Sequence, residues 1–575
     1  MAVDAGVREA LLKAALVNAV KHGGKAKLGP VLGALFSERP DLRSAVDRII
    51  PLAREVLSEV NKMALGDQRA LLEERWPGAL AEAEGGAGAR REGLPPLPNV
   101  DKYDRVITRF APNPDCVLHL GSARAAVLSH DYARMYKGLF YLRFEDTDPR
   151  TKAARLEFYE AIIEDLEWLG CKPDGVFIQS HRLPIYYEHA EKLIGMGKAY
   201  VCTCPRERFR ELVMACKPCP CRGLPVEEHL ERWEKMLDGD YGEGEAVVRV
   251  KTDLGHPNPA VRDWPALRII DPGKHPHPRP EVGEKGYRVW PLYNFACGVD
   301  DHLMGITHII RGKEHLVNEI RQRYLYAHLG WRYPEAIHYG RLSITGAVLS
   351  KSKIVAGVRR GLYSGWDDVR LATLRALRRR GITAEAIRRL MLDIGPKPAD
   401  ITVSWENLYA INRKIIDPVA NRYFFVWEPV ELLVRGLPGE GPLRAELPLH
   451  PDDPERGKRV LQASCEGGEA RFLLSGPDAS SLAGGGMVRL MGLFNIQVLG
   501  LEQGRLLARF HSEELSVARR RKAPIIHWLP AEENIEVEVL RPDGIVRGLG
   551  EPGLAHEGVG ALVQLVRYGF GRIDE

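Results

Sequence analysis

A histidine followed closely by a glycine marks the first segment of the chain that could handle a nucleotide. The run TRFAPNPDCVLHLGSARAA (108–126) reads as a strand, a proline-rich turn with His119 and Gly121, and then a helix. The start of such a helix offers free backbone N–H groups and the positive end of its dipole, which favour phosphate. Gly121 would let a nucleotide approach closely, and His119 could donate to a phosphoryl oxygen as charge develops there. Alone, this pattern is more often structural.

A lysine-rich loop far downstream could act on the same phosphates. In GRLSITGAVLSKSK (340–353), Ser350, Lys351 and Lys353 lie in a stretch rich in glycine and serine. Lysines on such a loop can close over a triphosphate and neutralise the charge on a leaving pyrophosphate. By itself the pattern is typical of a solvated basic loop. The order of the two segments, on either side of an interrupted α/β region, favours an ATP site instead.

A cluster of cysteines indicates a metal ion. Five of the nine cysteines fall in one short stretch, at 202, 204, 216, 219 and 221. In a large cytosolic chain such a cluster favours metal over disulfides, and four thiolates from two short turns can enclose a tetrahedral zinc ion. We favour Cys202, Cys204, Cys219 and Cys221 as ligands of a structural Zn²⁺ ion. Sets that use Cys216, and a metal-free thiol cluster, remain alternatives.

The elements expected around these segments alternate between strand and helix. The pattern predicts strands at 105–110 and 139–146 and helices at 121–136, 155–170 and 315–330. This alternation implies a parallel, Rossmann-type sheet. The cysteine segment and its continuation to about residue 290, rich in glycine and proline, interrupt the sheet as an insertion.

The flanking regions have different textures. Apolar residues at helical spacing predict helices over 3–80, the run 82–99 has linker composition, and short alternating runs beyond 415 predict an all-β half with barrels. We therefore predict a multidomain α/β plus all-β protein, with a connecting domain of arginine-rich helices after the sheet. The expected domains are 1–81, helical; 82–99, linker; 100–199, first half of the Rossmann-type domain; 200–290, insertion; 291–355, second half of the Rossmann-type domain; 356–415, helical connecting domain; and 416–575, β-barrels.

Composition narrows the class of protein without naming it. The chain has 575 residues, 45% hydrophobic and 27% charged, with a formal net charge of +4. These values exclude collagenous and wholly disordered proteins, and the small net charge says little about partners. No apolar run reaches the ~20 residues of a membrane span, and residues 1–10 do not resemble a secretory signal. We expect a cytoplasmic protein with no membrane partner.

Five motifs in order give the chain a family resemblance. RFAPNP, HLGS, FEDTDP, VDDHLMGITHIIRGKEH and LSKSK all occur between residues 109 and 353. Together they resemble the glutamyl and glutaminyl branch of the class I aminoacyl-tRNA synthetases, in the archaeal and eukaryotic layout. The resemblance implies an ATP site, with Mg²⁺, built from His119, Gly121, Ser350 and Lys351. Two positions depart from the family pattern, because Ser122 replaces a second histidine and Val348 replaces a lysine.

The resemblance also implies which amino acid is bound. Arg109 and Arg311 match the two arginines that hold the glutamate side chain in glutamyl enzymes, with Tyr293 beside them, whereas glutaminyl enzymes carry no arginine at the position of Arg311. Glu145 matches the acid that takes the substrate α-ammonium. The alternatives are ion pairs at strand ends for the arginines and a core position for Tyr293. For Glu145, Asp146 and Asp148 they are a Mg²⁺ site or capping of a helix near Thr151.

The implied activity is ATP-dependent ligation of L-glutamate to tRNA-Glu, in two steps through glutamyl-adenylate. Members of this branch use the 2′-hydroxyl of the terminal ribose and need bound tRNA for activation; some also charge tRNA-Gln. The zinc insertion would contact the acceptor end of the tRNA, the C-terminal barrels its anticodon, and we expect a monomer. The alternatives are a glutaminyl-tRNA synthetase, a small-molecule nucleotidyltransferase and a non-catalytic, zinc-containing RNA-binding protein.

Overall fold

The computed structural model describes residues 5–21, 23–38, 42, 46–79 and 93–574. Two compact units divide the chain, Met1–Leu94 and Pro95–Glu575. None of the described helices is both long and apolar enough to cross a membrane. Of the predicted linker at 82–99, residues 82–92 lie outside the described part of the chain.

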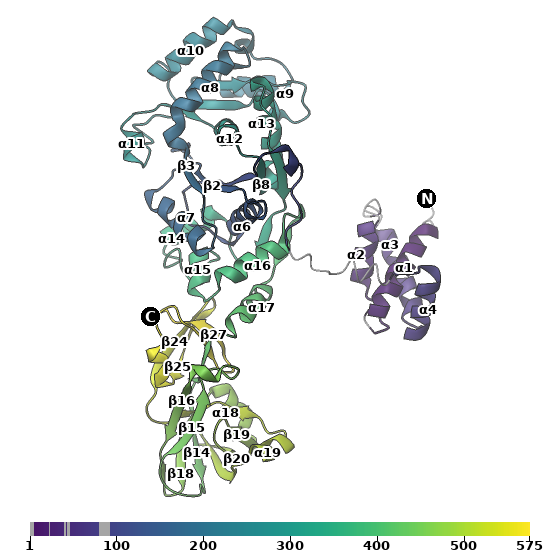
Figure 1. Cartoon of the computed structure of the whole chain (residues 1–575), viewed down its shortest axis with the longest axis vertical. Coiled ribbons are helices and arrows are strands. Elements are labelled where there is room, and N and C mark those ends of the chain that lie inside the picture. The colour runs from purple at the N-terminus through teal and green to yellow at the C-terminus, as the bar shows by residue number, and fades with distance from the viewer. Residues whose placement is uncertain (1–4, 22, 39–41, 43–45, 80–92, 575) are drawn as a thin grey trace. The chain divides into compact units, whose positions relative to one another are not determined.

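The first unit consists of helices that pack around one apolar core (Figure 1). They are α1 (Ala5–Lys21), α2 (Leu28–Glu38), α3 (Val46–Val60) and α4 (Leu65–Arg75). Leu11, Ala15 and Leu16 of α1 recur at helical spacing and are fully buried, as the sequence predicts. Burying each leucine stabilises the fold by about 1.5–3 kcal/mol.

The second unit begins with a parallel sheet in the order β1-β2-β3. The strands are β1 (Ile107–Phe110), β2 (Leu139–Phe144) and β3 (Gly175–Ile178), and α6 (Leu120–Met135) and α7 (Leu156–Trp168) connect them. The strands and helices predicted here thus exist, with ends shifted by one or two residues. The α/β alternation is the pattern expected of a Rossmann-type sheet.

A second parallel pair continues this layer after the insertion. Strands β8 (His308–Gly312) and β9 (Glu335–Tyr339) pair in parallel, preceded by α12 (Tyr293–Leu303) and joined by α13 (Leu316–Leu329). Strand β8 starts beside β1, because Thr307 N–H donates to the Ile107 carbonyl and Ile107 N–H donates to the Thr307 hydroxyl at 2.8 Å. Residues about 200 positions apart thereby meet at the ends of β1, β2 and β8.

The insertion between β3 and α12 is an antiparallel sheet in the order β4-β5-β6-β7, with its own core of buried tryptophans. Its elements are α8 (Leu183–Gly195), β4 (Ala199–Cys202), α9 (Arg206–Met214), α10 (Val226–Asp238), β5 (Val247–Val250), β6 (Pro265–Ile269), α11 (Pro280–Gly283) and β7 (Val289–Pro291). The cysteines therefore lie at the first edge of a separate sheet.

The helices that follow the second parallel pair pack against the three-stranded sheet β1-β2-β3. They are α14 (Lys351–Arg359), α15 (Leu374–Arg379), α16 (Ala384–Ile394) and α17 (Trp405–Ile416), with a short pair of strands, β10 (Leu342–Ile344) and β11 (Ile401–Val403). Leu377 and Ile387 join the same core as Leu142 and Ile162. An isolated bridge between His119 and Thr373 ties the start of α6 to the start of α15.

The C-terminal region is mainly β, with an eight-stranded sheet and smaller sheets beside it. Its strands are β12 (Asn421–Tyr423), β13 (Phe425–Trp427), β14 (Val430–Arg435), β15 (Leu443–Pro448), β16 (Lys458–Ala463), β17 (Cys465–Glu466), β18 (Glu469–Leu474), β19 (Gly486–Leu490), β20 (Asn495–Glu502), β21 (Arg505–Ser512), β22 (Ile525–Ile526), β23 (Leu529–Pro530), β24 (Ile535–Arg541), β25 (Gly544–Gly550), β26 (Leu562–Leu565) and β27 (Gly569–Arg572). Two short helices, α18 (Gly476–Leu482) and α19 (Leu515–Arg520), correct the all-β expectation. The first strand of the region, β12, pairs with β26 near its end.

Candidate active site

The start of α6 is closed by a reciprocal cap between His119 and Ser122. His119 is the N-cap residue, and its Nδ1 accepts a hydrogen bond from Ser122 N–H at 3.2 Å. In return the Ser122 hydroxyl accepts from His119 N–H at 2.9 Å. This is the geometry of a capping box, which satisfies two amide groups at a helix start. Ser122, one of the two departures from the family pattern, thus holds the histidine in place.

The cap also sets the proton on the imidazole. Because a backbone N–H always donates, Nδ1 must be the unprotonated nitrogen, and the ring proton of the neutral form lies on Nε2. Burial, together with the nearby Lys351 ammonium, lowers the pKa of His119 to about 4. At neutral pH His119 is therefore an uncharged Nε2–H donor.

The two sequence segments predicted to bind ATP meet at this helix start. A Cβ added to Gly121 would lie 2.9 Å from His119 Cε1 and 3.9 Å from Leu349 Cδ1. Gly121 therefore makes room for the histidine ring. Lys351 begins α14, with Ser350 as its N-cap residue, and Lys351 Nζ forms an ion pair with Asp115 Oδ1 at 2.9 Å.

Buried charges form a continuous network where β1, β2 and α12 meet. Arg109 Nε and Nη2 donate to the two carboxylate oxygens of Asp301 at 3.0 and 3.1 Å. Arg143 Nη1 donates to Asp301 Oδ1 at 2.7 Å, and Arg143 Nη2 donates to Glu145 Oε1 at 3.0 Å. Although burial opposes it, the two arginines lower the pKa of Asp301 to about 2. Asp301 is therefore charged at neutral pH.

Glu145 is held through one of its two oxygens. Its Oε1 accepts from Arg143 and also from the buried thiol of Cys297 at 3.0 Å. The Glu145 N–H donates to the Pro112 carbonyl, which links this acid to the turn before His119. No described side chain donates to Oε2. The second oxygen is therefore available for a cation.

Arg311 lies in the same region with neutral partners only. Its Nη1 donates to Gln322 at 3.1 Å, its Nη2 to the Tyr333 hydroxyl at 3.0 Å and its Nε to His338 at 3.4 Å. Its side chain is only 5% exposed, and no described carboxylate forms an ion pair with it. A buried guanidinium of this kind favours an anion beside it.

Tyr293 lies among these groups. Burial raises the pKa of its hydroxyl. Cys297, Glu145, Arg311 and Arg109 are near enough to act on the same hydroxyl electrostatically. The structure thus brings together Arg109, Glu145, Tyr293 and Arg311, four residues that are up to about 200 positions apart in the sequence.

Asp146 and Asp148 have structural partners. Asp146 accepts from the Tyr159 hydroxyl and from both the N–H and the hydroxyl of Ser180. Asp148 accepts from Thr151 N–H and from Arg268. The alternative of a helix near Thr151 is wrong, because α7 begins at Leu156. The two aspartates hold loops of the sheet and the insertion in place.

Four thiols gather at the first edge of the insertion sheet. The sulfur atoms of Cys202, Cys204 and Cys221 all lie within 4.8 Å of one another, and Cys219 Sγ lies 3.9 Å from Cys202 Sγ. The Cys204–Cys221 pair is 3.6 Å apart. Because Zn–S bonds of about 2.3 Å in a tetrahedron put the sulfurs about 3.8 Å apart, the spacing of Cys202, Cys204 and Cys221 fits zinc. Cys219 has the matching distance to Cys202 but does not belong to the group of three. Cys216 is exposed.

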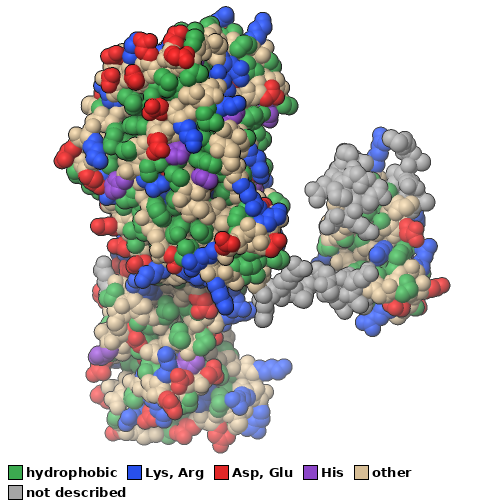
Figure 2. Space-filling model, turned by 45° about the horizontal axis from the view of Figure 1, so that its top comes forward, with side chains coloured by type: hydrophobic (Ala, Val, Ile, Leu, Met, Phe, Trp, Pro, Cys, Tyr) green, Lys and Arg blue, Asp and Glu red, His purple; other side chains and the backbone are tan. Residues whose placement is uncertain are grey.

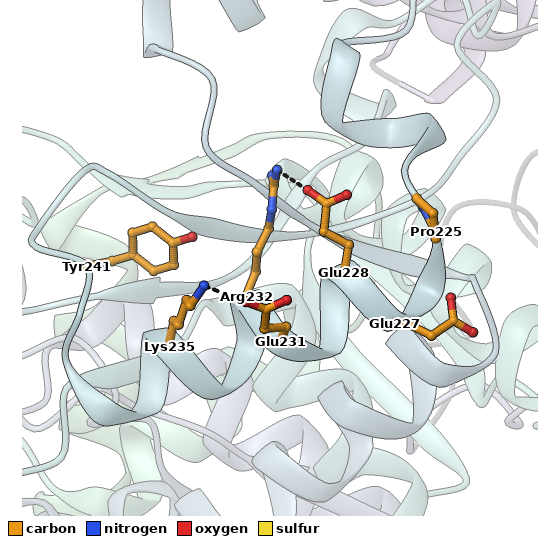
Figure 3. Close-up of a pocket in the computed structure, with 7 residues that line it drawn as sticks. All are labelled: Pro225, Glu227, Glu228, Glu231, Arg232, Lys235 and Tyr241. Atoms are coloured by element: carbon orange, nitrogen blue, oxygen red, sulfur yellow. Dashed lines mark hydrogen bonds and ion pairs between the residues drawn. The ribbon is translucent and has the colours of Figure 1, made fainter.

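A hollow of about 620 Å³ lies beside the thiols, on α10 (Figure 3). Arg232 lines it, donating to Glu228 at 2.6 Å and to Cys221 Sγ at 3.5 Å, while Lys235 pairs with Glu231. The hollow is largely acidic, and of its charged side chains only Glu227 has no ion pair with another described residue. Nothing in this arrangement indicates a ligand.

Most arginine side chains of the arginine-rich helices α15 and α16 contact other residues of the fold. Arg375 pairs with Glu164, Arg379 with Asp574, and Arg388 with Asp131. Arg380 stacks over the Trp405 ring at 4.2 Å. These contacts hold α15 and α16 against their surroundings. Figure 2 shows lysine and arginine side chains in a band across the middle of the larger body.

Sequence reasoning missed four residues of the site: Asp115, Arg143, Cys297 and Asp301. Only Arg143 carried a local signal, because it lies two positions before Glu145 in the strand predicted at 139–146 and would share a face with it, although β2 itself ends at Phe144. Asp301 lies in the motif VDDHLMGITHIIRGKEH, but its partners Arg143 and Arg109 are 158 and 192 positions away.

Comparisons with known proteins agree with the site. Residues 105–418 match the catalytic domain of class I tRNA synthetases for E and Q, and residues 420–510 and 525–574 match their anticodon-binding domains. The chain belongs to this family of class I tRNA synthetases.

The curated relatives come from one branch of that family. The chain is 53% identical over 573 residues to a glutamate–tRNA ligase of Pyrococcus furiosus, covering 99% of this chain and 97% of that protein. It is also 53% identical to the one of Thermococcus kodakarensis, with the same coverage, and 48% identical to the one of Thermofilum pendens, covering 100% and 98%.

Proposed function

We propose that the chain ligates L-glutamate to tRNA-Glu in two ATP-dependent steps at one site. Its membership of the family and its full-length similarity to glutamate–tRNA ligases support the reaction. The observation that carries the choice of amino acid is Arg311, a buried guanidinium with only neutral hydrogen-bond partners in the described structure. The side-chain carboxylate of glutamate would supply the missing anion.

A count of charges supports glutamate over glutamine. The residues described at the site include three arginines and two carboxylates: Arg109, Arg143 and Arg311, against Glu145 and Asp301. The substrate's α-ammonium and α-carboxylate cancel each other, so its side-chain carboxylate balances the one excess positive charge. Glutamine would leave that charge buried and unpaired, at a cost of about 1–3 kcal/mol or more.

In the first step, the glutamate α-carboxylate attacks the α-phosphorus of ATP and pyrophosphate leaves. Glu145 Oε2 would accept the α-ammonium, and Arg109 and Arg311 with Tyr293 would hold the side chain. His119 Nε2–H and Lys351 Nζ would stabilise charge on the phosphoryl oxygens, next to the amides of Gly121 and Ser350. Mg²⁺ carried by ATP supplies further charge neutralisation.

In the second step, the terminal ribose hydroxyl of the tRNA attacks the acyl carbon and AMP leaves. No described side chain at the site has the position of a general base, so positioning of the two substrates supplies most of the acceleration. The domains at 420–510 and 525–574 would bind the anticodon, in barrel form, and the insertion at 200–290 the acceptor end. The protein would act as a monomer. Its domains would follow the order predicted from the sequence.

We also propose that Cys202, Cys204, Cys219 and Cys221 hold a structural zinc ion. The sulfur spacing and a donor set of four thiolates support this assignment, and a closed set of four ligands leaves no position for reactive water. Metal analysis of the purified protein should find about one zinc per chain. The Cys219→Ala variant should lose the metal and unfold at a lower temperature, whereas Cys216→Ala should keep both. Equal zinc content in the two variants would contradict the ligand set.

The reaction is tested by aminoacylation with labelled glutamate or glutamine, each with separate tRNA-Glu and tRNA-Gln transcripts. Transfer of glutamate to tRNA-Glu is the expected result, and transfer to tRNA-Gln as well would identify a non-discriminating enzyme. Transfer of glutamine would contradict the argument from Arg311. With neither amino acid transferred, the nucleotidyltransferase and RNA-binding alternatives would return.

A further inference from the structure

Arg143 joins the two ends of the proposed amino-acid site. It lies near the end of β2, and its side chain is fully buried. One arm of its guanidinium donates to Glu145, the proposed acceptor of the α-ammonium. The other arm donates to Asp301, which also accepts two hydrogen bonds from Arg109. Arg109 is a proposed partner of the substrate's side-chain carboxylate. Arg143 thus contacts the machinery at both ends.

The chemistry of arginine makes this connection rigid. A guanidinium is planar and carries its donors in a fixed fork, so the two carboxylates that it binds are held at a fixed separation. Met304 Sδ lies 3.8 Å from Nη1, and Asp300 lies 4.0 Å from Nε, so that the fork is enclosed. A lysine in this position would offer one point charge and could not hold both acids in the same way.

We propose that Arg143 is a positioning residue that sets the length of amino acid the site accepts. By fixing Glu145 relative to Asp301 and Arg109, it fixes the distance between the ammonium site and the carboxylate site. On this proposal the distance suits glutamate, and aspartate, which is one methylene shorter, would not reach both ends. The inference rests on the proposed roles of Glu145 and Arg109, and it adds a basis for selecting chain length to the selection of charge.

The test is Arg143→Lys, assayed by aminoacylation of tRNA-Glu with glutamate and with aspartate. We expect KM for glutamate to rise about 10- to 100-fold, because Glu145 and Arg109 lose their common anchor, with KM for ATP within about twofold of the wild type. The ratio of kcat/KM for glutamate over aspartate should fall by about tenfold or more. The matched control is Arg134→Lys, an exposed arginine of the same domain that also forks onto an aspartate, Asp174. Arg134→Lys should change neither KM for glutamate nor the ratio of kcat/KM for glutamate over aspartate.

Asp301→Asn provides a second variant in case Arg143→Lys does not fold, which thermal unfolding would show. It keeps the shape of the aspartate and removes the charge that both arginines share, so we expect the same rise in KM for glutamate and the same loss of the ratio. A merely structural role would lower the unfolding temperature without this effect on glutamate alone. If the folded variants keep the wild-type KM and ratio, the proposal is wrong.

Glu145→Gln separates this proposal from the function on which it rests. If KM for glutamate rises in Glu145→Gln but not in Arg143→Lys or Asp301→Asn, the site assignment stands and Arg143 does not set the length. If Glu145→Gln leaves KM for glutamate unchanged, the assignment of Glu145 itself is wrong, and the length argument fails with it.

Discussion

The amino-acid site and the nucleotide site of this protein are built in opposite ways. Around the amino acid, Arg109, Arg143 and Asp301 are almost completely buried and locked to one another before any ligand binds. At the nucleotide, Lys351 and Asp115 form an ion pair whose side chains are 35% and 26% exposed. Selecting one small amino acid requires fixed, dry charges, whereas a large and highly charged nucleotide can displace water and a surface ion pair as it binds.

The largest effect should come from the buried side of this contrast. Arg311→Gln removes the proposed partner of the substrate carboxylate, and kcat/KM for glutamate should fall by about a thousandfold or more, because a desolvated charge pair is lost. KM for ATP should stay near the wild-type value in the same aminoacylation assay. Arg208→Gln, which breaks an exposed pair with Glu211 on α9, is the control and should stay active. A loss that falls equally on ATP and glutamate would remove the contrast.

A smaller effect, on rate and not on binding, is expected at His119. His119→Ala removes the Nε2–H donor, and kcat should fall about 100- to 1,000-fold while KM for glutamate changes little. Because the pKa of His119 is lowered to about 4, the neutral donor persists above about pH 5, and kcat should show no titration near pH 6.5 from this group. The exposed His181→Ala is the control. A wild-type pH profile with a step near 6.5 that disappears in His119→Ala would contradict the assigned proton.

The smallest effect should come from the ion pair at the nucleotide site. Asp115→Asn frees Lys351 from a partly exposed partner, and such pairs contribute at most about 1 kcal/mol, so KM for ATP should fall by no more than about fivefold. The effect should shrink as salt is added. Glu231→Gln, which breaks a surface pair in the insertion, should leave KM for ATP unchanged. A large rise in KM for ATP would instead show that Asp115 itself organises the nucleotide site.

The two sites also differ in how far the sequence predicts them. The nucleotide site uses local signals, because His119, Gly121 and Ser122 are neighbours at one helix start, and the structure brings Lys351 close to them. The helices and strands around them were predicted to within a few residues, because apolar spacing is a local property. The amino-acid network depends on pairs such as Arg143 with Asp301, which no local pattern reveals. Four of its residues were named only through a resemblance to a family.

The departure at Ser122 shows the same limit. From the sequence it is a missing histidine at the nucleotide site, whereas in the structure its hydroxyl and amide complete the cap of α6 around His119. The consequence of a substitution therefore depends on the hydrogen bonds that the new residue forms. Those bonds depend on the backbone geometry at the helix start.

The pairing of β12 with β26 has a consequence for how the chain folds during synthesis. Residues 421–423 leave the ribosome long before residues 562–565, so β12 cannot pair with β26 until the later residues have been made. The parallel strands β1, β2 and β3 come from the first part of the second unit and can pair early. The ion pair between Arg379 and Asp574 forms later still. The protein therefore completes its C-terminal sheets and their attachment to α15 as the last steps of folding.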